Sequence, residues 1–103
     1  MADLPTTEFD EGFVQGMRDR TAVSFFKYGP LANAVANKAD FITALVTRLE
    51  KYKETGNTEW LMDVANYAMF EAMYPSHRNA HFRATDSDES PGKAPERKRV
   101  RPV

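Results

Sequence analysis

Four carboxylates that flank a short turn at Gly56 are the strongest candidates for chemistry in this chain. They form two pairs, Glu50 with Glu54 and Glu59 with Asp63. Residues four apart on a helix lie on the same face, so each pair could act together. Oxygen ligands from two packed helices suit Mg²⁺ when it holds the phosphates of a nucleotide. The four acids therefore predict a magnesium-dependent nucleotide site.

Three of these acids also have a simpler interpretation. At about 100° per residue, Glu50 and Glu54 lie well off the apolar stripe of the helix that precedes the turn. They could therefore be exposed to solvent, as most acidic residues are. Glu59 suits the positive end of a helix that begins just before it.

Asp63 is less easily explained as a surface residue, because it lies in the second turn of a helix that is apolar almost all round. A buried charge is unfavourable unless it is paired or coordinates a metal. We expect Arg48 or Lys27 to be its partner. Asn66 continues the same narrow polar stripe, so Asp63 and Asn66 together require a partner in the fold.

The patterns that must position these residues are helical. Apolar residues recur at helical spacing in three segments, and each segment is bounded by capping residues or by glycine and proline. The expected helices run from a cap at Thr6 or Thr7 to Tyr28, from Asn37 to Glu54 and from Asn57 to Glu71. Residues 31–36 form an apolar connector with at most one helical turn. We predict an all-α fold, a compact bundle of three to four helices built on an antiparallel hairpin, with the N-terminal helix as its third wall.

The ends of the chain differ from this helical part. We predict a loose lead at 1–7, one helical domain at 8–82 and a disordered tail at 83–103, which is acidic first and then basic. Such a basic cluster could contact nucleic acid or an acidic partner, or could only improve solubility. Its members are Lys93, Arg97, Lys98, Arg99 and Arg101.

Composition excludes several classes of function. The net charge is −1, and the 103 residues include no cysteine, so disulfides and thiolate chemistry are absent. The sequence has no glycine-rich phosphate loop and no GxSxG motif. It also has no apolar run that approaches the ~20 residues of a membrane span. We expect a cytoplasmic protein without membrane contact.

The run from 47 to 71, TRLEKYKETGNTEWLMDVANYAMFE, resembles the small helical nucleotide-modification-associated domains of phages and prophages. It is similar, more distantly, to the all-α nucleoside triphosphate pyrophosphohydrolases of the MazG-like type. Arg48 and Leu49 match the first helix of the pattern, and Asp63 with residues 65–68 matches the second. The resemblance covers about a third of the chain.

The Lys-Tyr-Gly at 27–29 is also similar to a segment of phage purine-nucleotide diphosphohydrolases of that group. MazG-like enzymes carry paired acids as ExxE and ExxD, whereas the pairs Glu50/Glu54 and Glu59/Asp63 are each spaced by four. Of this acid set, the resemblance therefore carries over only Asp63.

The resemblance implies a phage-type protein that binds or hydrolyses a nucleoside triphosphate with Mg²⁺ in the host cytoplasm. It also implies a homodimer, because MazG-like relatives complete their sites across subunits. The implied residues are Asp63 for catalysis, Asn66, Arg48 and Lys27 for substrate, and Glu59, Asp63, Glu54 and Glu50 for the metal. The alternative is a non-enzymatic phage accessory protein that binds a host or phage protein, with the basic tail contacting nucleic acid.

Overall fold

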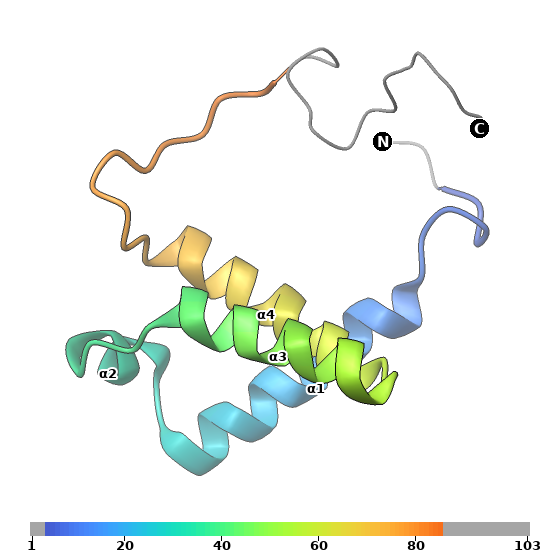
Figure 1. Ribbon diagram of the computed structural model, residues 1–103, viewed down its shortest axis with the longest axis horizontal. Helices are drawn as coiled ribbons and strands as arrows, with labels where there is room; N and C mark the ends of the chain where they lie inside the picture. Colours follow the sequence, from blue (N-terminus) through green and yellow to red (C-terminus); the bar gives the residue numbers. More distant parts are fainter. Residues whose placement is uncertain (1–3, 86–103) are drawn as a thin grey trace.

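The structure is a computed structural model that describes residues 4–85, and within this range all regular secondary structure is helical (Figure 1). The elements are α1 (Glu11–Tyr28), α2 (Leu31–Ala36), α3 (Phe41–Thr55) and α4 (Glu59–Met73). The predicted all-α bundle is confirmed. None of these helices is long and apolar enough to cross a membrane. The basic cluster predicted for the tail lies outside the described residues: Lys93, Arg97, Lys98, Arg99 and Arg101.

α1 begins later than the sequence pattern predicted. The carboxylate of Asp10 caps the helix, because its Oδ1 accepts hydrogen bonds from the amides of Gly12 at 2.9 Å and Phe13 at 3.2 Å. These amides have no partner inside the helix, so a side-chain acceptor stabilises the first turn. The predicted cap at Thr6 or Thr7 is therefore wrong.

α3 also begins later than predicted, at Phe41 rather than at Asn37. Asn37 ends α2, and Lys38 has a left-handed backbone with φ of 62°, which a continuous α-helix cannot include. Asp40 is the true cap. Its carboxylate accepts from the amide of Thr43 at 2.9 Å and from the Thr43 hydroxyl at 2.7 Å. Both bonds lower the pKa of Asp40, because they stabilise its charged form.

The predicted hairpin of α3 and α4 forms around Gly56, whose φ of 74° gives the left-handed conformation that ends α3. Its two helices enclose an aromatic cluster. Phe41 is 5% exposed, and its ring centroid lies 6.2 Å from that of Tyr67 and 5.7 Å from that of Phe70. This cluster is the nearest approach to a hydrophobic core in the described part of the chain.

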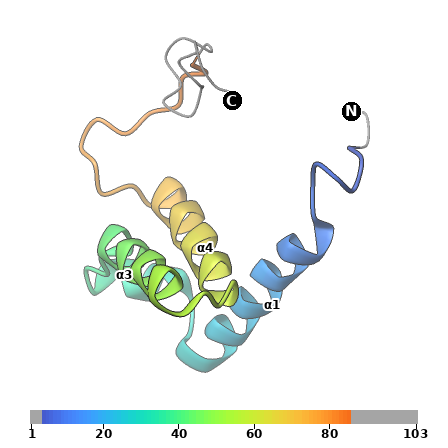
Figure 2. The same ribbon diagram turned by 45° about the vertical axis from the view of Figure 1, so that its right-hand side comes forward.

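α4 lies between α3 and α1, as the two views show (Figures 1 and 2). α1 packs against α4 where a glycine permits close approach. A Cβ at Gly16 would lie 2.6 Å from the thioether end of Met62. On the C-terminal side of this crossing, no other described helix packs over α1, and every residue from Ala22 to Tyr28 is exposed. α1 contains no buried residue, so polar contacts must contribute much of its attachment to α4.

Candidate functional site

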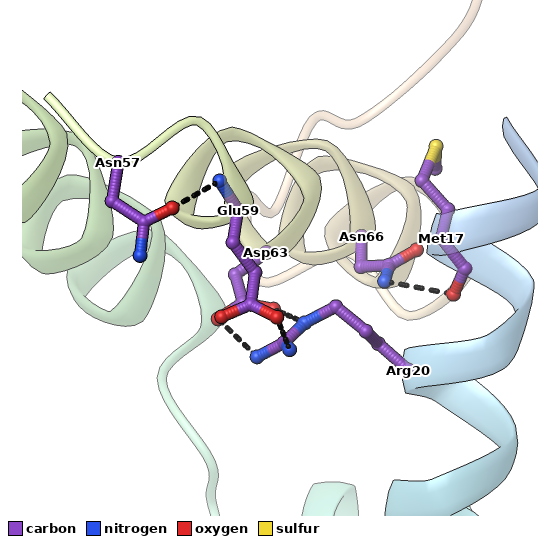
Figure 3. Close-up of polar contacts among 6 residues, drawn as sticks. All are labelled: Met17, Arg20, Asn57, Glu59, Asp63 and Asn66. Atoms are coloured by element: carbon purple, nitrogen blue, oxygen red, sulfur yellow. Dashed lines mark hydrogen bonds and ion pairs between the residues drawn. The ribbon is translucent and has the colours of Figure 1, made fainter. Parts of the chain in front are cut away.

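Asp63 is paired with an arginine that the sequence interpretation did not consider. The guanidinium of Arg20 on α1 donates from Nε to Asp63 Oδ1 at 2.6 Å and from Nη2 to Oδ2 at 3.0 Å (Figure 3). Its Nη1 lies 2.8 Å from Glu59 Oε2. The predicted pairing of Asp63 with Arg48 or Lys27 is therefore wrong. One cation from α1 holds two successive acids of α4.

This pair is well placed to be a structural element. The Asp63 side chain is 15% exposed and that of Arg20 is 37% exposed, so solvent screens the pair only in part. The hydrogen bond to Asp63 is the main cause that raises the pKa of Arg20, against a smaller opposing effect of burial. Both carboxylate oxygens of Asp63 are engaged. The geometry of this contact makes Asp63 a tertiary link between α1 and α4.

The other candidate metal ligands are not gathered around Asp63. Glu50 and Glu54 each lie 3.6 Å from a lysine of α3 itself, and their side chains are well exposed. Among residues 4–85, no three acidic or histidine side chains lie close enough together to hold one ion. Arg20 contacts both Glu59 and Asp63 and offsets one of their two negative charges. The acids that the sequence suggested do not form one ligand cluster, and they do not fit a resident Mg²⁺ ion.

The residues predicted to bind substrate do come together. A cleft of about 430 Å³ opens between α1 and α4, and Arg48 reaches it from α3. Its size is within the usual range for small-molecule sites. Its lining includes three cations, two carboxylates and three polar or aromatic side chains: Arg20, Lys27, Arg48, Asp19, Asp63, Tyr28, Asn66 and Tyr67.

Two cations of the cleft have no acidic partner in the part of the chain that the structure describes. The Arg48 guanidinium carbon lies 5.0 Å from the ring centre of Tyr67, and its Nε is buried without an acceptor. Lys27 places its Nζ 5.2 Å from the ring centre of Tyr28. Contact of a cation with an aromatic face is favourable but leaves its N–H groups free for an anion.

Asn66 adds an unpaired acceptor at the wall of the cleft. Its side chain is 4% exposed, and Nδ2 donates to the main-chain oxygen of Met17 at 3.1 Å (Figure 3). Because a carbonyl can only accept, this bond fixes the orientation of the amide. Oδ1 is then buried without a donor, as is the hydroxyl of Thr21. Such unpaired buried groups are uncommon in folded proteins, and both of these atoms are covered by other atoms of the chain.

The cleft therefore offers positive charge at one side, aromatic rings beside each free cation, and a buried acceptor at its wall. This combination suits a small anion that also carries a flat polar ring. Two carboxylates also line the cleft, Asp19 and Asp63, and that of Asp63 is held by Arg20.

Arg20 is the residue that the sequence interpretation missed. Its signal in the sequence is a cation at a break in the apolar spacing of α1, between Met17 and Val23.

Comparisons of the chain with protein-family models, with curated proteins and with solved structures find no match.

Proposed function

We propose that the chain is a phage-type nucleotide-binding protein whose ligand lies in the cleft between α1 and α4. The observation that carries this proposal is the guanidinium of Arg48, which lines the cleft beside Tyr67 and has no acidic partner in the described part of the chain. A phosphate oxygen is a suitable acceptor for the N–H groups of a guanidinium. The sequence resemblance to nucleotide-handling domains supports the same ligand class.

We expect the phosphates of the nucleotide to lie near Arg48 and Lys27. Arg20 also lines the cleft, but its charge is offset by Asp63 and Glu59. Arg48 and Lys27 thus supply the attraction for an anion, while Tyr67 beside Arg48 offers a ring on which a base could stack.

We propose binding rather than hydrolysis as the activity. The Mg²⁺-dependent pyrophosphohydrolase chemistry implied by the resemblance would require Asp63 to release Arg20 before it could assist catalysis. It would also require further acids near Asp63. Any Mg²⁺ at the cleft is bound to the phosphates of the nucleotide. We expect the protein to act in the cytoplasm of the host cell.

A thermal-shift measurement with a panel of ribo- and deoxynucleotides tests the proposal. A ligand at a hundred times its Kd stabilises a protein by about 2.7 kcal/mol, which corresponds to a rise in Tm of roughly 10–20 °C for a domain of this size. Arg48→Gln should abolish the shift. Lys53→Gln removes a cation from an exposed position of the same helix and should preserve it. If no nucleotide changes the Tm of the wild-type chain, the proposal fails.

A second candidate function is that of a phage accessory protein that binds a host or phage protein. The exposed second half of α1 supports it, because Phe26 is 83% exposed and Val23 is 64% exposed. Large apolar groups exposed together often mark interaction sites. A pull-down from host lysate with wild type and Phe26→Glu tests this role. A specific partner that the variant no longer recovers supports it, and recovery of the same proteins by both contradicts it.

A further inference from the structure

The cleft between α1 and α4 has an acidic part as well as a basic one. Asp19 lines it from an exposed position of α1, and its Oδ1 accepts a hydrogen bond from Nε2 of Gln15 at 2.8 Å. An amide is neutral, so this bond does not offset the negative charge of Asp19. Within residues 4–85, no cation forms an ion pair with Asp19.

Arg20, the residue that follows Asp19, adds no free positive charge to the cleft. Its guanidinium lies 2.6 Å from Asp63 and 2.8 Å from Glu59, so one cation stands against two carboxylates. Figure 3 shows both acids directed at this single guanidinium. Together with Asp19, the side chains around Arg20 leave this part of the cleft with excess negative charge.

The two free cations lie apart from this acidic part. Lys27 is seven residues beyond Arg20, which at about 1.5 Å per residue is about 10 Å further along the axis of α1. Arg48 enters from α3 and contacts the ring of Tyr67, which lies one helical turn beyond Asp63 on α4. Arg48 and Lys27 therefore supply two positive charges that no acid among residues 4–85 offsets.

We propose that this cleft selects nucleoside monophosphates over nucleoside di- and triphosphates, an inference that rests on the nucleotide-binding function proposed above. A phosphate monoester carries a charge of about −1.5 to −2 at pH 7. Arg48 and Lys27 together balance that charge. Each additional phosphate brings more negative charge, finds no further free cation in the described lining, and is repelled by Asp19 and by the excess charge around Arg20.

The selected ligand differs from the triphosphate that the sequence resemblance implies. Proteins that hold a triphosphate usually neutralise it with Mg²⁺, which carboxylates bind together with the phosphates. Asp63 and Glu59 are instead engaged by Arg20, and no three ligating side chains gather around one point among residues 4–85. The protein's own cations must then balance the charge of the ligand, and two of them suffice only for a monophosphate.

Isothermal titration of the full chain in EDTA with the mono-, di- and triphosphates of adenosine, guanosine, cytidine and thymidine tests the inference. For a base that binds, Kd should rise with each phosphate. The triphosphate should bind at least roughly tenfold more weakly than the monophosphate, as repulsion between charges about 8 Å apart near a protein surface allows. A triphosphate that binds as tightly as the monophosphate, or more tightly, would overturn the inference.

Asp19→Asn separates electrostatic repulsion from a simple lack of space. It should lower the ratio of the triphosphate Kd to the monophosphate Kd at least about threefold, because it removes one repelling charge. Glu11→Gln removes an equal charge from the exposed first turn of α1, outside the cleft, and should leave this ratio unchanged. An unchanged ratio in Asp19→Asn, or an equal change in both variants, would contradict selection by charge.

The proposed function and this inference fail in different ways. If no nucleotide binds, or if Arg48→Gln binds nucleotides as the wild type does, the function proposed for the cleft fails and this inference fails with it. If binding depends on Arg48 but favours the triphosphate, only the selection of monophosphates is wrong.

Discussion

The pair of Arg20 and Asp63 provides the sharpest quantitative prediction, because it joins α1 to the hairpin. The two side chains form a bidentate, charge-assisted contact with lengths of 2.6 and 3.0 Å. Exposed ion pairs contribute about 0.2–1 kcal/mol, and removal of one partner from a fully buried pair costs about 3–5 kcal/mol. At 15% and 37% exposure the pair lies between these limits. After allowance for solvent screening, we expect a coupling free energy of about 1–2 kcal/mol.

A double-mutant cycle with Arg20→Gln and Asp63→Asn measures this coupling. Urea unfolding followed by circular dichroism gives the free energy of unfolding for each variant. With a slope of about 2 kcal/mol per molar urea, the coupling corresponds to a shift in midpoint of roughly 0.5–1 M. Raised salt should weaken the coupling free energy only in part, because the pair is partly shielded from solvent.

The exposed pair of Glu50 and Lys53 is the matched control. Their side chains are 64% and 65% exposed and their charged atoms lie 3.6 Å apart. The same cycle with Glu50→Gln and Lys53→Gln should give less than about 0.5 kcal/mol. A coupling for Arg20 and Asp63 that is no larger than this control would refute the structural role assigned to Asp63.

Three further predictions concern other parts of the chain. Asp40→Ala should lower the urea midpoint at neutral pH. The pKa of Asp40 in the folded protein lies below its ordinary value of 3.8, so this cap stabilises the fold fully above pH 3.8. The difference in urea midpoint between wild type and variant should vanish as pH falls through the lower pKa of the folded protein. A difference that stays unchanged in acid would contradict this prediction. Gly16→Ala should cost less than about 1 kcal/mol by urea unfolding, because the flexible thioether end of Met62 can move away from the added Cβ; a larger loss would show that α1 and α4 cannot relax around Gly16. Deletion of residues 93–103 should remove any salt-sensitive retardation of DNA in a gel, and unchanged retardation would exclude the tail as a nucleic-acid contact.

The sequence predicted those parts of the fold that local signals determine. Gly56 and the short link after it gave the antiparallel hairpin, because glycine adopts the left-handed conformation that ends a helix. Gly29, with φ of 93°, ended α1 as expected. The starts of α1 and α3 were misplaced, since several residues near each start could act as caps. The choice depended on backbone conformation, such as the positive φ of Lys38, which the sequence pattern did not reveal.

The arrangement of the candidate site depends on contacts between residues far apart in the sequence. Lys27, Arg48 and Asn66, which the resemblance implied for substrate binding, line one cleft with Asp63. The actual partner, Arg20, is 43 residues away in sequence. Which face of α1 meets α4 depends on how two helices cross, and helical periodicity does not determine that angle.

We propose that Arg48 and Lys27 hold the ligand without a resident metal, while Asp63 stabilises the packing of α1 on α4. Isothermal titration of the full chain with nucleotides in EDTA tests it most directly. We predict that binding persists in EDTA, is lost in Arg48→Gln and is retained in Lys53→Gln. An absence of binding, or binding that requires Mg²⁺ and fails in Asp63→Asn while that variant remains folded, would contradict the claim.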